Sequence, residues 1–437
     1  MKTKKMRKKM MSGLLAAAMT LSMCMGTGVT AFAADVDPKV DAQAAVTKKL
    51  VMDEHVTIPA ATFKFSVAKI AEGTTTDGNN ATVNLETDGP DLKIADLTYS
   101  ATSGSKTVDG VKVAAQESLL KDSEGNDLTG ADFTHAGVYA YTVTETANTY
   151  TITDAAKEAM VYSKAEYKVF VVVQNGESGL YISGFTVVQT KKDDGTDGTA
   201  KVDPTPGGNE TTGDGDSDME FQNIYNRTGN TVDPTDPNPD ENYSKNGALS
   251  AWKEVTGALA DMTKKFDFSL TVNKPAILDK LVAQSGGQYP AYKATIVDAT
   301  TGEAIEGAEE VTVTFDKTTA PITKTFKLGH NQKLKFDTLP VGTTYSLTEN
   351  NGNKITNYDT TITGKADNVA FAETKGTMTT SDKLVGEKAN YTKVENNYND
   401  QPITGIVTEN LPFILLIAAA VLGFAAYLVV KRRKFVK

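Results

Sequence analysis

The stretch LSAWKEVTG, residues 249–257, decides how the chain folds and also raises a question of chemistry. Side chains alternate between the two faces of a β-strand, so Leu249, Ala251, Lys253 and Val255 share one face. A lysine therefore stands in the middle of an apolar stripe, although lysine is almost never fully buried without a partner. Either this strand has no buried face, or Lys253 lies inside for a chemical reason.

The same pattern occurs twice along the chain. Each half opens with a lysine strand, carries a Tyr-x-x-x-Glu strand and closes on an asparagine strand. The six segments are AAVTKKL (44–50), YTVTE (141–145) and FQNIY (221–225), then LSAWKEV (249–255), YSLTE (345–349) and VENNY (394–398). Strand parity places one polar residue of each segment on its apolar face. These are Lys48, Glu145 and Asn223 in the first half, and Lys253, Glu349 and Asn396 in the second. Asn397 is an alternative to Asn396, but parity and the Asn-x-Tyr spacing shared with Asn223 favour Asn396.

Three polar groups in an apolar core are costly unless they satisfy one another. Burial lowers the pKa of a lysine and raises that of a glutamate, so a free amine can face a protonated carboxyl. We expect this carboxyl to donate to the asparagine side-chain carbonyl and to move protons. The amine would then attack the amide carbon, release ammonia and leave a neutral Lys–Asn isopeptide bond. The alternative is that the lysines extend to a sheet edge and the other groups form ordinary hydrogen bonds.

The rest of the chain predicts an all-β protein. Short alternating runs rich in Thr, Val, Tyr and Phe, such as TFKFSV, YKVFVVV and FDFSLTV, are broken by Gly, Asn and Asp, as in antiparallel β-sandwiches. We expect one sandwich over 40–227, a linker over 228–247 and a second sandwich over 248–400. DAAKEAM (154–160) predicts a short surface helix, and the acidic run 191–218 a mobile loop. Asp214, Asp216 and Asp218 lack the glycine and glutamate of an EF-hand, which favours a solvated loop over a calcium site.

VTKKL, YTVTE and FQNIY resemble the isopeptide-linked pilin domains of Gram-positive bacteria, the streptococcal type related to CnaB modules. LPVGTTYSLTE (339–349) is similar to the second domain of that family. The second half departs from the family pattern, because Trp252 precedes the lysine and Val394 replaces a phenylalanine. The resemblance implies two tandem immunoglobulin-like (CnaB-type) sandwiches. It also implies two bond-forming triads, Lys48–Glu145–Asn223 and Lys253–Glu349–Asn396, in which Glu145 and Glu349 are catalytic.

The two ends of the chain carry targeting patterns. Residues 1–33 combine a basic start, an apolar run and Ala31-Phe32-Ala33, which predicts a cleaved signal peptide; a lipid-modified Cys24 is the weaker alternative. At the other end, QPITG (401–405) precedes an apolar run over 411–430, long enough to span a membrane, and a basic tail. Residues 401–437 thus look like a cell-wall sorting signal, in which a sortase cuts between Thr404 and Gly405. A plain membrane anchor is the alternative.

Composition restricts the function. Processing at both ends removes eleven basic residues and Glu409, and takes the formal charge from -10 to about -20, which argues against nucleic acid as a partner. The only cysteine, Cys24, leaves with the signal peptide, so no disulfide is available. The three histidines are far apart in sequence, and no nucleotide-binding or nucleophile motif is present. We therefore expect no metal and no cofactor.

These observations predict a pilus (fimbrial) subunit at the cell wall rather than an enzyme. Its partners would be a sortase, neighbouring pilin subunits and peptidoglycan. Lys191, Lys192 and Lys201 are candidate acceptors for the next subunit. The alternative is a monomeric wall-anchored adhesin that binds a host or microbial ligand. No catalytic cluster in the sequence supports a secreted enzyme, and the only chemistry we expect is single-turnover self-modification.

Overall fold

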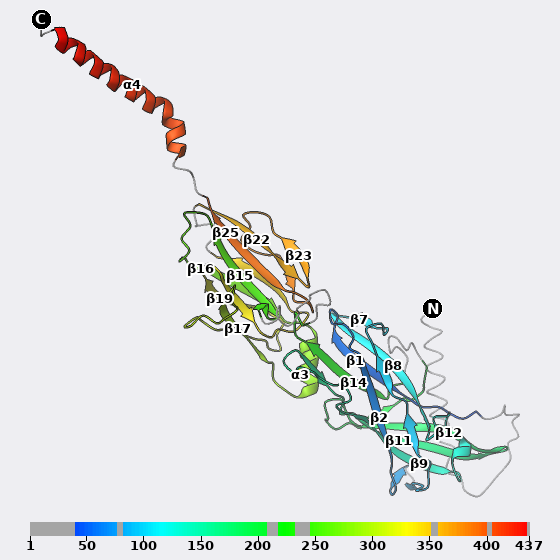
Figure 1. Ribbon diagram of the computed structural model, residues 1–437. Coiled ribbons are helices and arrows are strands. Elements are labelled where there is room, and N and C mark those ends of the chain that lie inside the picture. The colour runs from blue at the N-terminus through cyan, green and yellow to red at the C-terminus, as the bar shows by residue number, and fades with distance from the viewer. Residues whose placement is uncertain are drawn as a thin grey trace.

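The computed structural model describes residues 40–76, 82–207, 217–231, 245–350, 357–399 and 404–434. It is built mostly of β-strands, arranged as two β-sandwich domains that lie end to end (Figure 1). The expected signal peptide and Gln401–Ile403 of the sorting motif lie outside the described residues, as do Asp214 and Asp216. The prediction of an all-β chain is confirmed.

The first domain consists of two sheets that face each other. One has the order β10-β14-β1-β8-β5, with β7 paired to β8. The strands are β10 (Glu158–Val161), β14 (Glu220–Arg227), β1 (Ala45–Asp53), β8 (Val111–Asp122), β5 (Leu92–Ile94) and β7 (Lys106–Val108). The other has the order β13-β12-β11-β9-β2-β6. Its strands are β13 (Lys201–Val202), β12 (Gly179–Lys191), β11 (Glu166–Gly176), β9 (Gly137–Thr146), β2 (Ala61–Lys69) and β6 (Leu97–Tyr99).

Two smaller elements complete this domain: a hairpin of β3 (Thr74–Thr76) and β4 (Thr82–Asn84), and a 3₁₀ turn, η1 (Gly130–Asp132). Buried side chains of both sheets form one core between them. Val46 and Phe221 contribute from one sheet, and Val143, Val169 and Val171 from the other.

The second domain repeats this arrangement. Its larger sheet has the order β18-β17-β20-β15-β25-β22-β23. The strands are β18 (Val311–Thr314), β17 (Ala291–Asp298), β20 (Gln332–Phe336), β15 (Leu249–Thr256), β25 (Tyr391–Tyr398), β22 (Tyr358–Ala366) and β23 (Val369–Ala372). The smaller sheet, β19-β16-β21-β24, contains β19 (Ile322–Leu328), β16 (Phe266–Asn273), β21 (Thr344–Glu349) and β24 (Lys383–Leu384). Helix α3 (Ile277–Ser285) follows β16.

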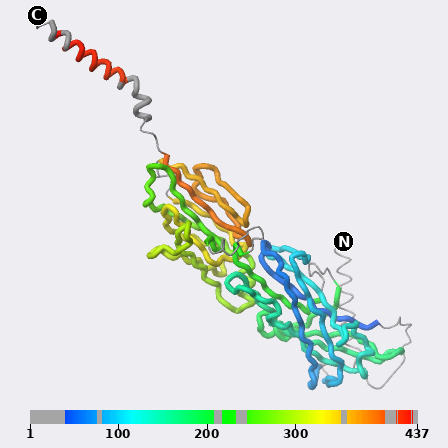
Figure 2. Tube along the Cα trace, viewed as in Figure 1, coloured from blue at the N-terminus to red at the C-terminus, as the bar shows by residue number. Residues whose placement is uncertain are grey.

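In both domains the first and last strands are parallel neighbours. β1 pairs with β14, and β15 pairs with β25, although each pair is separated by most of its domain in sequence. Figure 2 shows this by colour: the blue start of the first domain lies beside green chain, and the green start of the second lies beside orange chain. Each domain therefore begins and ends on two strands that are hydrogen-bonded directly to each other.

The joint between the domains is well packed. Ile277 of α3 contacts the first domain through a buried apolar cluster with Val51 and Ile224. Glu387 accepts hydrogen bonds from the Thr57 main-chain N–H and hydroxyl, at 3.0 and 2.6 Å, and lies 3.4 Å from an Arg227 nitrogen. These contacts attach the second domain firmly to the first.

Gly342 is needed at this joint. Its φ is +89°, and a Cβ there would lie 2.0 Å from an Asp53 oxygen of the first domain. The described residues of the expected linker also contact the second domain, since the Gly229 and Asn230 N–H groups donate to Leu339 and Gly386.

One sequence prediction is wrong. Residues 154–160 are not a helix: Asp154–Lys157 form a turn, and Glu158 begins β10, which gains a full set of pairing partners on β14. In the expected loop 191–218, most described residues lie outside strands; Lys191 ends β12, and Lys201–Val202 form β13, which pairs with β12.

At the C-terminal end, Thr404 and Gly405 begin helix α4 (Thr404–Lys434). No helix in the described part of the chain is long and apolar enough to cross a membrane, so the expected span over 411–430 is not confirmed.

Candidate functional site: two buried Lys–Glu–Asn triads

The first triad lies between the two sheets of the first domain. Lys48 is on β1 and Asn223 on its parallel neighbour β14, where Lys48 is opposite Phe221, two residues before Asn223. Glu145 comes from the facing sheet, near the end of β9. Lys48 and Asn223 are 0% exposed. Strand parity thus brings together three polar side chains from positions distant in sequence, as predicted.

One carboxylate contacts both reactants in this triad. Lys48 Nζ donates to Glu145 Oε2 at 2.8 Å, and Asn223 Nδ2 donates to Glu145 Oε1 at 2.6 Å. The Lys48 ammonium also lies 4.7 Å from the centre of the Phe63 ring. A carboxylate placed in this way can take a proton from the amine with one oxygen and supply one to the amide nitrogen with the other.

The second triad has the same plan. Lys253 on β15 is opposite Val394, two residues before Asn396 on β25, and Glu349 ends β21 in the facing sheet. Lys253 and Asn396 are 0% exposed, and the Lys253 ammonium lies 4.3 Å from the centre of the Phe266 ring. Asn397, the alternative to Asn396, is exposed on the opposite face.

The contacts around Glu349 differ from those around Glu145. Both partners lie on the same oxygen: Asn396 Nδ2 donates to Oε1 at 2.9 Å, and Lys253 Nζ lies 3.1 Å from it. Lys253 Nζ has no well-oriented hydrogen bond, and Glu349 Oε2 has no hydrogen-bond partner among the described residues. Glu145 thus contacts its two partners through separate oxygens, whereas Glu349 contacts both through one oxygen.

Burial shifts the acid–base properties of these groups. Desolvation lowers the pKa of Lys48 to about 8, against the attraction of Glu145, and lowers that of Lys253 to about 8, against Glu349. Desolvation raises the pKa of Glu145 above its ordinary value, although Lys48 opposes the shift. In the first triad, burial thus favours the neutral amine of Lys48 and the neutral carboxyl of Glu145 over their charged forms.

The expected hydrogen bond from a protonated glutamate to the asparagine carbonyl is wrong in both domains. The Asn223 amide turns its nitrogen to Glu145, and its oxygen accepts from the Ser163 main-chain N–H at 2.7 Å. The Asn396 oxygen accepts from the Thr360 hydroxyl at 2.8 Å. A main-chain N–H can only donate, so the carbonyl oxygen has to face Ser163 and the nitrogen is left for Glu145.

Sequence reasoning missed these donors. Thr360 could have been found, since it shares the inward face of β22 with Ile362. Nothing in the sequence indicates Ser163, which follows β10 in a loop held by Asp193: the Ser163 hydroxyl donates to Asp193 at 2.6 Å, and the Gln222 N–H donates to the same oxygen at 2.9 Å.

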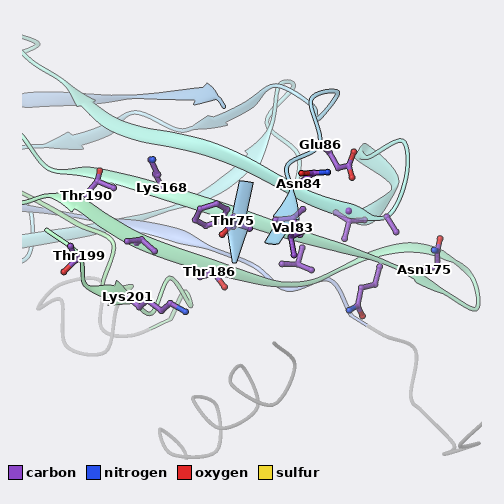
Figure 3. Close-up of a pocket in the computed structure, with 18 of the residues that line it drawn as sticks. Thr75, Val83, Asn84, Glu86, Lys168, Asn175, Thr186, Thr190, Thr199 and Lys201 are labelled. Carbon is purple, nitrogen blue, oxygen red and sulfur yellow. The ribbon is translucent and has the colours of Figure 1, made fainter. Parts of the chain in front are cut away.

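The candidate acceptor lysines lie together at one side of the first domain. Lys191 ends β12, with its Nζ 3.5 Å from a Glu166 oxygen, Lys192 is in the following turn, and Lys201 is on β13. Lys201 also lines a cavity of about 770 Å³ on the outer face of the β11–β12 sheet. The β3–β4 hairpin lies across this face (Figure 3). Lys168, Phe170 and Val172, from the YKVFVVV strand, line the same cavity.

One group of potential metal-ligating side chains was not expected from the sequence. Glu86, Asp88 and His135 have ligand atoms within 4.8 Å of one another on the surface of the first domain. The His135 ring nitrogen Nε2 lies 3.3 Å from Asp88 and 3.8 Å from Glu86, which is the geometry of an exposed ion-pair cluster.

Residues 247–398, which form the second domain, match a family described as a domain of unknown function (DUF7601). No curated protein matches the chain. Among solved structures, the chain is similar to the major pilin of Streptococcus pyogenes, with 19% identity, 82% of this chain and 99% of the pilin covered, and a TM-score of 0.31.

Another S. pyogenes major pilin (T3.2) has 20% identity over 82% of this chain and 99% of its own, with a TM-score of 0.31. A pilus-presented adhesin (Cpa) has 12% identity over 53% of this chain and 35% of its own, with a TM-score of 0.22. Similarity at these TM-scores carries no functional argument.

Proposed function

We propose that the chain is a structural subunit of a surface fibre of the pilus type, strengthened by two internal Lys–Asn isopeptide bonds. The observation that carries this proposal is the repetition of one reactive arrangement in two domains. In each, a buried lysine and a buried asparagine on parallel terminal strands contact the same glutamate.

Condensation explains why these polar groups are buried. A proton passes from the lysine to the glutamate, and the neutral amine attacks Cγ of the asparagine. The C–N bond to Nδ2 then breaks, and ammonia leaves. The lysine ammonium and the glutamate carboxylate are replaced by a neutral amide and a neutral acid, which removes the cost of two buried charges. The fold holds the reactants in place, and this proximity supplies most of the rate.

The positions of the two bonds suit a protein under tension. Force on an anchored fibre enters through the chain ends, and in each domain the lysine is on the first strand and the asparagine on the last. A bond between them would carry the force past the hydrogen-bonded core. Asn396 is only eight residues before Thr404 in sequence, so force from an anchor at Thr404 would reach the second bond first.

We further propose that a sortase joins Thr404 to peptidoglycan or to a neighbouring subunit, after cleavage of Thr404–Gly405. The support is the QPITG motif followed by Lys431–Lys434. Lys191, Lys192 and Lys201 remain the proposed acceptors. We expect denaturing gels of wall extracts to show a ladder of high-molecular-weight species, and we expect this ladder to be absent when Thr404 is deleted. A single band of monomer size, released from the wall by a muralytic enzyme, would contradict polymerisation.

A monomeric wall-anchored adhesin is the second candidate, and the cavity beside β11 favours it. The cavity is lined by the apolar side chains of Phe170 and Val172, by the Lys168 cation and by the Glu86 carboxylate. Such a combination of apolar and polar groups is typical of ligand sites. A monomer-sized band together with binding of cells that is lost in Phe170→Asp would favour the adhesin over the fibre subunit.

A further inference from the structure

We propose that each triad has a fourth catalytic member, a hydrogen-bond donor that stabilises the negative charge on the asparagine oxygen during bond formation. The donors are the Ser163 main-chain N–H in the first domain and the Thr360 hydroxyl in the second. This inference rests on the proposed isopeptide bonds and goes beyond them, because it assigns a role to groups outside the Lys–Glu–Asn pattern.

Two chemically different donors reach the same atom in the two domains. Ser163 N–H lies 2.7 Å from Asn223 Oδ1, and the Thr360 hydroxyl lies 2.8 Å from Asn396 Oδ1. One donor is a main-chain group in a loop and the other is a side chain on a strand, so a repeated sequence motif does not explain why both domains have a donor at this oxygen. The position of the neighbouring strand explains it: β10 and β22 pair with the asparagine strands β14 and β25 on the side away from the lysine strands.

The register shows how each donor reaches the oxygen. Thr360 is directly opposite Asn396 in the antiparallel β22–β25 pair, and its side chain is buried. Ser163 is two residues beyond Val161, the last β10 residue paired with β14. Asp193 acts as a positioning residue: it accepts from the Ser163 hydroxyl and so fixes the loop that presents the N–H group.

The reaction places charge at this oxygen. When the neutral Lys253 amine attacks Cγ of Asn396, the carbonyl electron pair moves to Oδ1, which becomes an oxyanion. The attacking nitrogen then loses a proton, the leaving Nδ2 gains one through Glu349, the carbonyl re-forms and ammonia departs. The proton that Lys253 first gave up stays on Glu349. A hydrogen bond to Oδ1 is stronger in the charged intermediate than in the amide, and so it lowers the barrier.

In the second domain the donor is a side chain, which allows a direct test. Thr360→Val keeps the shape and the branching at Cβ but removes the hydroxyl. Full-length protein is made by cell-free translation and quenched into guanidinium at intervals, and intact mass and cross-linked peptides are followed by mass spectrometry. We expect the second bond to form about 100- to 1,000-fold more slowly, which is the usual effect of losing one oxyanion donor.

The controls come from the same chain. The first bond should form at an unchanged rate in Thr360→Val and serves as an internal standard for folding of the chain. Thr361→Val, on the opposite face of β22, should leave both rates unchanged, and Thr360→Ser should restore most of the second rate. To separate chemistry from folding, Thr360→Val is also placed in a Lys253→Ala background, where it should not change the unfolding of the second domain.

The outcomes separate this inference from the proposed function. If the unmodified chain never loses ammonia, the isopeptide proposal itself is wrong. If it loses two molecules of ammonia and Thr360→Val forms the second bond at the normal rate, only the role of Thr360 is overturned. The same follows if Thr360→Ser is as slow as Thr360→Val, or if Thr360→Val unfolds the second domain in the Lys253→Ala background.

Discussion

The substitution Asn396→Ala tests what the second bond contributes to stability. It removes the electrophile but leaves Lys253 and Glu349 in place, so the bond cannot form and the buried ion pair of 3.1 Å remains. The closed loop from residue 253 to residue 396 contains more than one hundred residues. A cross-link of that span restricts the unfolded chain enough to stabilise the domain by ~5 kcal/mol.

In a domain of this size, 1 kcal/mol changes the melting temperature by roughly 2–4 °C, so the second domain should melt about 10–20 °C lower. Trp252 is the only tryptophan and is on β15 beside Lys253, so its fluorescence reports unfolding of the second domain specifically.

Asn397→Ala is the matched control, since Asn397 is exposed on the other face of β25. It should retain both ammonia losses and a melting temperature close to that of the unmodified chain. A decrease of less than about 3 °C in Asn396→Ala, with only one ammonia lost from the mass of the variant and two lost from that of the unmodified chain, would refute a stabilising cross-link at this position.

Three further predictions concern the first triad and the domain joint. Glu145→Ala should leave the first bond open, so that intact mass rises by one ammonia, while Glu145→Asp should restore it in part. When refolding is quenched at intervals, the rate of first-bond formation should show a bell-shaped dependence on pH, because Lys48 and Glu145 must share one proton. The rate should fall below the raised pKa of Glu145, where both groups are protonated, and above the pKa of Lys48 of about 8, where the proton needed by the leaving ammonia is lost. A rate that rises steadily to pH 10 contradicts this. Glu387→Ala removes the acceptor shared by Thr57 and Arg227, so calorimetry should show the two domains melting more independently, with a loss of ~1–3 kcal/mol at the joint; superimposable melting curves would argue against a rigid joint.

Much of the site could be predicted because strand parity is a local property. Whether Lys253 faces the core depends only on its neighbours along β15, and the same holds for Glu349 and Asn396. The repeat in the sequence then gave the order of the three strands. The apolar alternation that predicted the sandwiches is equally local, and both domains fold as β-sheets.

The errors arose where tertiary contacts override local preference. Residues 154–160 favour a helix by composition, yet Glu158 is buried and accepts hydrogen bonds from Tyr150 and Tyr225, which holds the segment as a strand. The orientation of the asparagine amides could not be predicted either. It depends on Ser163, whose position is set by Asp193 in a segment that composition alone describes as a loop.

Intact mass of the purified chain from residue 34 to residue 404 tests the central claim most directly. The folded protein should be lighter than its sequence by two molecules of ammonia, and digestion should give one peptide that joins Lys48 to Asn223 and another that joins Lys253 to Asn396. A mass equal to that of the unmodified sequence would mean that these buried side chains are neighbours that never react.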